Sequence, residues 1–395
     1  MVDAVPSVRH TPARRHGGLT MAEALIVGGG LAGAGAAIAL ASAGRQVILL
    51  EREARPHDKV CGEFLSREAV LYLEALGIDP VALGARTIDR VRLALGRRVV
   101  TARLPFSALS LSRRTLDAAI LERALASGAD IRAGAAAQSL ERNGDGWQAR
   151  LRGGETIDAR SAFLATGKHD LRGWSRPNGM QSGLIGFKTY FRLQPGETQA
   201  LAGVVELMLF PGGYAGLELV EDGAANLCLL VRRDRFAALG QRWDALLAAI
   251  REDCPLLDQR LSGAEPGLDR PLAVYAIPYG HIATGGDGLW RLGDQGAVIP
   301  SFSGDGMSIA LHSARLAAKF YLAGRVAEDY QHRMARDIRI PVWFATIVSL
   351  LAVDPIGRRL VGSVATVLPR LMAAAASGTR IPVAALRRAG LVVDS

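Results

Sequence analysis

Three glycines and one carboxylate near the start of the chain could together bind a dinucleotide. Gly28, Gly30 and Gly33 follow the apolar run Ala24–Val27, and Glu51 lies about 20 residues beyond them. In this spacing the first glycine permits a tight turn, the second lets the backbone approach a pyrophosphate, and the third lets helix and strand pack closely. A carboxylate at the position of Glu51 can accept hydrogen bonds from a ribose. The pattern predicts dinucleotide binding.

Two segments late in the chain could hold a flavin. Asp294 follows the apolar run Leu289–Leu292, where a carboxylate can bind ribityl hydroxyls. The glycine-rich segment 300–306 (PSFSGDG) then opens a predicted helix. Free N–H groups and the positive dipole end of such a helix suit the anionic edge of a reduced flavin. One ligand would thus join two distant parts of the chain.

The hydrophobic pattern predicts the elements that position these residues. The alanine-rich segment Leu31–Ala43, which ends at Gly44, is typical of a helix between two buried strands. Apolar runs between Gly and Pro turns over 183–231 indicate an inserted antiparallel sheet. The predicted fold class is α/β with an α+β insert: a Rossmann-like FAD-binding domain, an inserted antiparallel-sheet substrate domain and C-terminal helices. The predicted division is a disordered tail at 1–20, a discontinuous FAD-binding domain at 21–88, 106–180 and 276–335, a substrate-binding sheet at 89–105 and 181–275, and C-terminal helices at 336–395.

Composition and charge argue against several other classes of protein. The 395 residues include three widely spaced cysteines, which fit a reducing cytoplasm better than a disulfide framework. The net charge of +9 comes from scattered arginines without a nucleic-acid-binding motif, so no nucleic-acid partner is expected. No histidine pair has metal-ligand spacing, so no metal is expected. The apolar run Pro341–Val353 is too short to span a bilayer. The predicted location is cytoplasmic, with peripheral membrane contact through the C-terminal helices as an alternative.

Five segments carry a resemblance to a known superfamily: GGGLAG at 28–33, Glu51, SRRTLD at 112–117, ATG at 165–167 and GDQGAVIPSFSGDGMSIALHSA at 293–314. The chain resembles the FAD-dependent aromatic hydroxylases (group A flavin monooxygenases) and geranylgeranyl reductases. The resemblance implies FAD as cofactor and places the arginine of the SRRTLD segment against it. The predicted cofactor-binding residues are Gly28, Gly30, Leu31, Ala32, Gly33, Glu51, Arg52, Arg113, Gly167, Asp294, Gly304, Gly306 and Met307.

A Cys-Gly-Glu segment is the most unusual local motif. Cys61-Gly62-Glu63 resembles a segment that lies beside the flavin ring in the prenyl reductases. Cys61 and Gly62, together with Pro300 of the late loop, are the predicted catalytic residues. The thiol could donate to the flavin, or it could be a small buried residue that lets the loop approach the ring.

The leading prediction for function is an FAD-dependent monooxygenase that hydroxylates a hydrophobic phenolic or polyketide-type small molecule. The alternative is a flavin-dependent reductase of prenyl or polyene double bonds, which the Cys-Gly-Glu segment favours. A flavin-binding protein without catalysis is a third class. Halogenation is disfavoured because no lysine closely follows Gly62-Glu63. The aromatic residues predicted to face the substrate, which could equally be core, are Tyr190, Phe210, Tyr214 and Tyr275.

The electron donor is less clearly indicated. The hydroxylases usually carry Asp-Gly where this chain has Ala165-Thr166-Gly167, and no second strand–GxGxxG–helix unit exists for a nicotinamide cofactor. The expectation is that NADPH or NADH docks transiently without a domain of its own, or that a separate flavin reductase supplies electrons.

Overall fold

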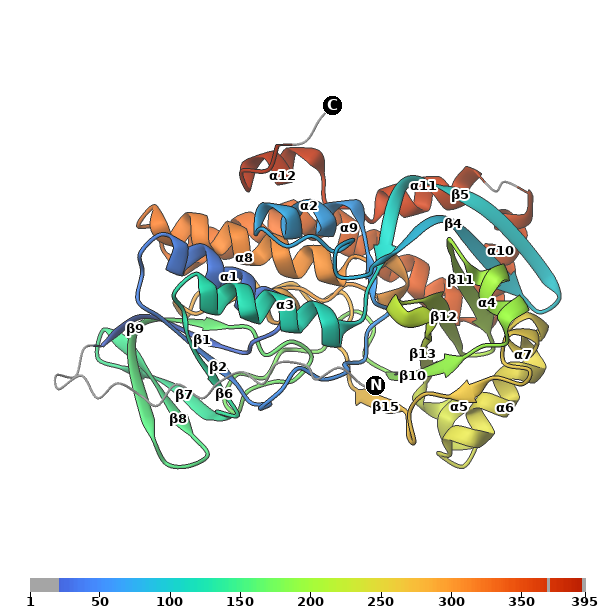
Figure 1. Cartoon of the computed structure of the whole chain (residues 1–395), viewed down its shortest axis with the longest axis horizontal. Helices are drawn as coiled ribbons and strands as arrows, with labels where there is room; N and C mark the ends of the chain where they lie inside the picture. The colour runs from blue at the N-terminus through green and yellow to red at the C-terminus, as the bar shows by residue number, and fades with distance from the viewer. Residues whose placement is uncertain (1–20, 368–369, 393–395) are drawn as a thin grey trace.

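The computed structural model describes residues 21–367 and 370–392, which form two sheets joined by helices (Figure 1). The predicted disordered tail at 1–20 lies outside the described residues. The first sheet has parallel strands in the order β6, β2, β1, β9, with β16 paired to β9 and the hairpin of β7 and β8 continuing from β9. Its strands are β1 Ala22–Val27, β2 Val47–Glu51, β6 Asp130–Ala133, β7 Ala137–Asn143, β8 Gly146–Leu151, β9 Thr156–Leu164 and β16 Trp290–Arg291.

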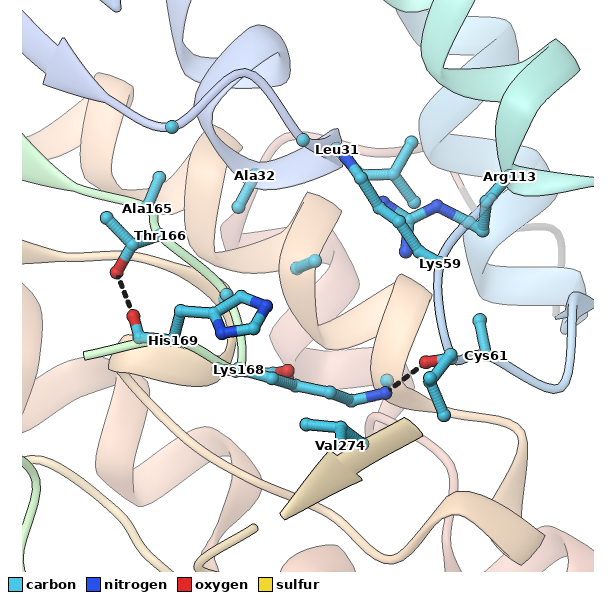
Figure 2. A pocket seen from close by; sticks show the side chains of 18 of the residues that line it. Leu31, Ala32, Lys59, Cys61, Arg113, Ala165, Thr166, Lys168, His169 and Val274 are labelled. Atoms are coloured by element: carbon cyan, nitrogen blue, oxygen red, sulfur yellow. Dashed lines mark hydrogen bonds between the residues drawn. The ribbon is translucent and has the colours of Figure 1, made fainter. Parts of the chain in front are cut away.

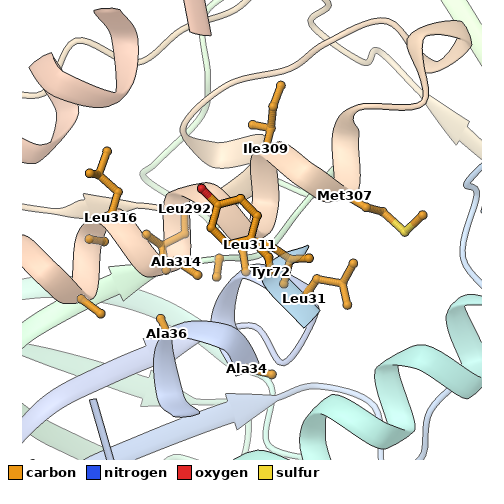
Figure 3. Packing of buried hydrophobic residues seen from close by; sticks show 14 of the residues in the cluster. Leu31, Ala34, Ala36, Tyr72, Leu292, Met307, Ile309, Leu311, Ala314 and Leu316 are labelled. Atoms are coloured by element: carbon orange, nitrogen blue, oxygen red, sulfur yellow. The ribbon is translucent and has the colours of Figure 1, made fainter. Parts of the chain in front are cut away.

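Helices rich in small residues cover this sheet. In Figure 1, α1 and α3 lie below the long helix α8. The added Cβ of a residue at Gly35 would lie 3.3 Å from the Cβ of Ala314, because α1 and α8 pack closely. Figure 3 shows the resulting core, in which alanines of α1 face leucines of α8 and the ring of Tyr72. The helices are α1 Leu31–Ser42, α2 Arg67–Ala75, α3 Arg113–Ala126 and α8 Gly306–Leu322.

The second sheet is inserted between the parts of the first domain. Its order is β14, β10, β13, β12, β11, β4, β5, β3, with β15 also paired to β10. Most pairs are antiparallel as predicted, but β4 and β11 run parallel. The chain returns to the first domain after β5, rejoins the second sheet at β10 and reaches β11 only after α4. The strands are β3 Phe64–Leu65, β4 Arg86–Leu95, β5 Arg98–Ser110, β10 Leu184–Arg192, β11 Val204–Phe210, β12 Gly213–Leu219, β13 Ala225–Arg232, β14 Glu265–Pro266 and β15 Leu272–Tyr275.

The two faces of the second sheet have different neighbours. The outer face packs an apolar core against the short helices α4, α5, α6 and α7, of which α5, α6 and α7 lie at the lower right of Figure 1. The inner face turns toward the first domain and the long helix α9. The remaining helices are α4 Pro195–Leu201, α5 Arg233–Ala238, α6 Trp243–Asp253, α7 Pro255–Arg260, α9 Ala327–Val353, α10 Pro355–Val367, α11 Arg370–Gly378 and α12 Val383–Arg388.

Among the described helices, none alone has the length and apolar character to cross a lipid bilayer. Helices α9 and α10 meet these requirements only as a pair, and they are bent by 109° where they join.

Candidate active site

A cavity of about 840 Å³ lies where the carboxyl ends of β1, β2 and β9 meet the inner side of the second sheet. Its wall includes the start of α1, the loop before β3, the segment after β9 and the start of α8. Figure 2 shows side chains from the first three of these segments, among them Leu31, Cys61 and Lys168, converging on the same space. The cavity thus brings together the early and late motifs of the sequence, as the single-ligand prediction requires.

In the first turn of the cavity wall and the helix after it, two positions have room only for glycine. Gly28 has a φ of +112°, and an added Cβ would lie 2.3 Å from the carbonyl oxygen of Ala165. An added Cβ at Gly33 would lie 1.8 Å from the carbonyl oxygen of Gly28. Gly30 is open by comparison, since the nearest atoms to its Cβ position are Arg113 Nη2 at 3.6 Å and Lys59 Nζ at 4.0 Å. Backbone N–H groups and two cations therefore line the place expected for a pyrophosphate.

A buried carboxylate holds those two cations in position. Asp117 accepts hydrogen bonds from Arg113 Nε at 2.9 Å and from Lys59 Nζ at 2.6 Å. Burial alone would raise the pKa of Asp117, but Arg113 and Lys59 hold it below its ordinary value. Figure 2 shows the Lys59 and Arg113 side chains next to each other at the cavity. Asp117 therefore stays ionised and fixes both cations toward the phosphate position.

Glu51 is fixed at the end of β2 by backbone hydrogen bonds. Its Oε2 accepts from the N–H of Gly29 at 2.8 Å, and its Oε1 accepts from the N–H of Glu53 at 3.0 Å. The carboxylate lines the cavity, with Arg52 beside it. This arrangement fits the predicted contact with a ribose.

No side chain of the described residues caps the start of α8. The carboxylate of Asp305 accepts from Arg380 Nη1 at 2.7 Å and from the hydroxyl of Ser308 at 3.3 Å. No described side chain therefore caps the first N–H groups of the helix, next to the cavity-lining Gly304 and Gly306. Gly304 has a φ of +71°, and its added Cβ would lie 2.4 Å from the ring of Phe64.

Most predicted cofactor-binding residues line this cavity, and their chemistry fits FAD. The glycine turn and the paired cations suit its pyrophosphate, the carboxylates of Glu51 and Asp294 suit its hydroxyl groups, and the uncapped helix suits its ring. Gly33 is set back and acts through packing instead. The predicted residues on the cavity wall are Gly28, Gly30, Leu31, Ala32, Glu51, Arg52, Arg113, Gly167, Asp294, Gly304, Gly306 and Met307.

The Cys61–Glu63 segment forms one wall of the cavity and is fixed to the second sheet. Asn226 Nδ2 donates to the carbonyl oxygens of Cys61 at 3.2 Å and Gly62 at 2.9 Å. The thiol of Cys61 accepts from the N–H of Glu63 at 3.4 Å. Of the predicted catalytic residues, Cys61 and Gly62 lie on the wall, whereas Pro300 lies behind its cavity-lining neighbours Ile299 and Ser301.

The structure separates the four predicted substrate-facing aromatic residues. Tyr214 lies on the inner face of the sheet, edge-on to Phe302 with ring centroids 5.9 Å apart. Tyr190 lies beneath the Cys61–Glu63 segment. Phe210 belongs to the core on the outer face, and Tyr275 is 58% exposed on β15. None of the four predicted aromatic residues is among the residues that line the cavity. Tyr275 is displaced because its neighbour Val274 takes the inward position of the strand.

Several cavity residues were not predicted from the sequence. Lys168 directly follows the ATG segment, and its ammonium donates to the carbonyl oxygen of Val60 on the opposite wall (Figure 2). Tyr279 donates to or accepts from Ser301, with the two hydroxyl oxygens 2.8 Å apart. Tyr279 directly follows Ile277-Pro278, and this position carries no periodic signal that would have indicated it.

Comparison with known proteins agrees with this assignment. A family model described as an FAD binding domain matches residues 21–168. A menaquinone reductase of Mycolicibacterium smegmatis is 24% identical over 339 residues, which cover 78% of each chain. Digeranylgeranylglycerophospholipid reductase 2 of Methanopyrus kandleri is 26% identical over 327 residues, again with 78% of each chain covered.

Solved structures share the whole architecture at lower sequence identity. The flavin-dependent brominase Bmp2 superposes with a TM-score of 0.74 at 17% identity, covering 92% of this chain and 95% of its own. The halogenase PltM in complex with phloroglucinol and FAD superposes with a TM-score of 0.72 at 16% identity, covering 84% of this chain and 76% of its own. At these identities the shared property is the fold.

Proposed function

Because the chain belongs to the superfamily of FAD-dependent aromatic hydroxylases and geranylgeranyl reductases, and is thus an FAD-dependent oxidoreductase, we propose that it is a monooxygenase that hydroxylates a hydrophobic phenolic or polyketide-type molecule. FAD would be held by the glycine turn, by Arg113 and Lys59, and by the carboxylates of Glu51 and Asp294. NADPH or NADH is the proposed source of electrons.

One observation carries the proposal: a pair of hydroxyl groups set in an apolar wall. Tyr279 and Ser301 line the cavity with their oxygens 2.8 Å apart, and the apolar residues Val274, Val298 and Ile299 line the same cavity. A phenol can exchange hydrogen bonds with such a pair while its ring rests on the aliphatic side chains. A purely hydrocarbon substrate could form no hydrogen bond with these hydroxyls.

A third hydroxyl, that of Tyr214, lies behind this wall. Tyr214 is 4% exposed, and its hydroxyl lies near Ser349 and the backbone of Phe302 without a well-formed hydrogen bond to any described residue. Burial raises the pKa of Tyr214, so the hydroxyl stays protonated. An unsatisfied buried hydroxyl costs about 1–3 kcal/mol, which a polar ligand or a water would recover.

Small residues lie on the inner face of the second sheet, behind the cavity wall. Strand register places Gly216 of β12 opposite Cys228 of β13. The nearest atom to an added Cβ at Gly216 is 3.8 Å away. Burial raises the pKa of the Cys228 thiol to about 12, which leaves it neutral.

The chemistry divides between cofactor and protein. Bound FAD supplies the activation of O₂ once it has been reduced. The apolar wall excludes water, and the hydroxyl pair orients the phenol. The uncapped start of α8 stabilises negative charge that lies next to this helix end. The protein thus contributes a dry, oriented and electrostatically prepared site.

A second candidate, reduction of prenyl or polyene double bonds, is supported by a separate observation. The curated relatives reported above are named for menaquinone and digeranylgeranylglycerophospholipid reduction. The Cys61–Glu63 segment, which resembles a prenyl-reductase motif, lines the cavity.

Oxygen dependence separates the two functions. The holoenzyme would be incubated with NADPH and, in turn, phloroglucinol, a long-chain alkylphenol and menaquinone, in air and under argon. If the protein is a monooxygenase, the product carries one oxygen atom from isotope-labelled O₂, and no turnover occurs under argon. A product that gains two hydrogens under argon would instead establish the reductase.

A further inference from the structure

The second half of α9 carries an apolar stripe that stays largely exposed. The inward side chains of this helix, such as Val342, Ala345 and Ala352, are buried in the body of the protein. Ile340 is 69% exposed and Trp343 is 53% exposed. Residues three or four positions apart lie on one side of a helix, and on this side they are Ile340, Trp343, Ile347 and Leu351. Helices with apolar residues on both sides normally have a partner on each side.

A second apolar stripe begins beyond the bend, on α10. Its members recur at every fourth position and are all exposed, with Ile356 at 80%: Ile356, Leu360 and Val364. The glycines of α10 instead pack tightly on the protein. An added Cβ at Gly357 would lie 2.6 Å from the carbonyl oxygen of Leu351, and one at Gly362 would lie 2.2 Å from the side chain of Leu95. Helix α10 is therefore held against α9 and the hairpin of β4 and β5 (Figure 1), with its apolar stripe outward.

Arginines flank both stripes, whereas carboxylates are almost absent from this part of the sequence. Asp354 is the only acidic residue between positions 338 and 392, and its side chain accepts from N–H groups in the first turn of α10. Arg336, Arg339 and Arg359 are exposed and have no carboxylate partner among the described residues. Arg336 continues the α9 stripe, since it lies four positions before Ile340. The two stripes thus form an apolar surface with a positive border.

The positive border indicates which kind of surface fits. A twofold dimer would place this surface against its own copy, so that arginines would face arginines with hardly any carboxylate between them. Because α9 and α10 are bent by 109° where they join, they suit a position along a membrane surface better than a crossing. An anionic lipid surface accepts apolar side chains between its headgroups, attracts arginines and favours an interfacial tryptophan such as Trp343.

The inward sides of α9 and α10 connect this surface to the cavity. Ala352 and Val353 of α9 belong to the apolar cluster that contains Tyr214 and Val298. Val298 also lines the cavity. Since the outward stripe lies on the opposite side of the same helix, it is separated from this cluster by about one helix diameter, roughly 10 Å. A bilayer at the outward stripe would thus lie close to the apolar lining of the cavity.

We propose that the outward sides of α9 and α10 form a docking surface for an anionic lipid bilayer. The apolar stripes enter the boundary between headgroups and acyl chains, the arginines pair with lipid phosphates, and both helices lie along the membrane. The proposal does not depend on which reaction the bound FAD serves. A negative result in the oxygen-dependence experiment above would therefore leave it standing.

Sedimentation with vesicles tests this surface directly. The holoenzyme would be mixed with vesicles of phosphatidylcholine alone or of phosphatidylcholine and phosphatidylglycerol in equal parts, at low and at high salt. We expect the wild type to bind the anionic vesicles at low salt and to bind the neutral vesicles more weakly. The double variant Ile356→Ser/Leu360→Ser should lower binding to the anionic vesicles by roughly tenfold or more, because it removes apolar area from the interface. Arg336→Gln/Arg359→Gln should lower it by roughly tenfold and leave binding to neutral vesicles unchanged.

Matched variants elsewhere on the molecule provide the controls. Val81→Ser/Leu125→Ser removes two exposed apolar side chains, and Arg150→Gln/Arg160→Gln removes two exposed charges, all far from α9 and α10 in the sequence. Both control variants should bind as the wild type does. Thermal unfolding and FAD content identify variants that fail to fold.

A spectroscopic measurement on Trp343 does not require a polar substitution. Anionic vesicles with brominated acyl chains should quench part of the tryptophan fluorescence of the wild type, and Trp343→Phe should bind equally well but lose this quenching. The proposal is overturned if the wild type does not bind anionic vesicles, if the control variants lose as much binding, or if the quenching persists in Trp343→Phe. A wild-type dimer in sedimentation velocity that Ile356→Ser/Leu360→Ser converts to a monomer would also overturn it, because the surface would then join two copies of the chain.

Discussion

The two halves of the cavity wall are built in different ways. The half formed by the first domain offers backbone groups and fixed charges: the turn at Gly28, the cations around Asp117 and the open start of α8. The half formed by the second sheet offers side chains from several strands, such as Val274 of β15 and Phe64 of β3. The cofactor half requires particular residue types at fixed spacing, whereas the substrate half requires only that suitable side chains meet in space.

This difference explains what each half can tolerate. The glycine turn cannot bind a cofactor when a side-chain atom is added at Gly28 or Gly33, because the neighbouring carbonyl group cannot move away. A wall of side chains can change shape by substitution while the sheet beneath it keeps its register. One fold can thus keep a single cofactor and serve different substrates.

The largest expected effect comes from adding a side chain to the glycine turn. Gly28→Val combines a φ of +112° with a Cβ position 2.3 Å from a carbonyl oxygen, so it should abolish FAD binding and cost at least about 3 kcal/mol of unfolding free energy. Flavin absorbance of the purified protein and urea unfolding would measure both. Gly44→Val is the control, since it shares a positive φ but has open space among the described residues. Equal losses in the two variants would contradict this role of the glycine turn.

Removing the charge that holds the cations should have a smaller effect. Asp117→Asn keeps the shape of the side chain but leaves Arg113 and Lys59 without their shared carboxylate. We expect FAD binding to weaken by roughly tenfold to a hundredfold, because the two cations lose their fixed positions. Fluorescence titration of the apoprotein with FAD would measure this, with Asp89→Asn at an exposed ion pair as the control.

The same contrast explains how much the sequence could predict. The turn at Gly28, the helix after it, and the positions of Glu51 and Asp294 follow from local patterns, whereas Arg113 follows from the family resemblance. The structure places all of them at one cavity. Phe210 was predicted to face the substrate, but alternation along a strand does not reveal which face is inward, and its ring lies in the outer core. The hydrogen bond from Tyr190 to Glu63 spans 127 positions and depends on strand pairing, which no local pattern specifies.

Stability should depend on pH through the start of α8. Burial raises the pKa of Asp305 from 3.8 to about 7, although Arg380 opposes the shift. The native protein therefore keeps a proton that the unfolded chain has already released, and stability falls as pH rises between these two values. Asp305→Asn should remove this dependence, so the wild type should lose on the order of 2 kcal/mol relative to the variant between about pH 5 and pH 8. Urea unfolding of the FAD-saturated proteins would measure it, and parallel pH profiles would refute it.

The smallest expected effect tests whether the two faces of the second sheet are independent. Phe210→Leu alters the outer core, so it should cost about 1 kcal/mol of stability and leave phenol binding unchanged. Tyr279→Phe alters the inner wall, so it should weaken phenol binding by roughly tenfold with little loss of stability, because only one hydrogen bond is removed. Urea unfolding and titration of each holoenzyme with phloroglucinol provide the two readouts. If Phe210→Leu weakened phenol binding as much as Tyr279→Phe does, the sheet would transmit packing changes between its faces, and the substrate half could not vary independently of its core.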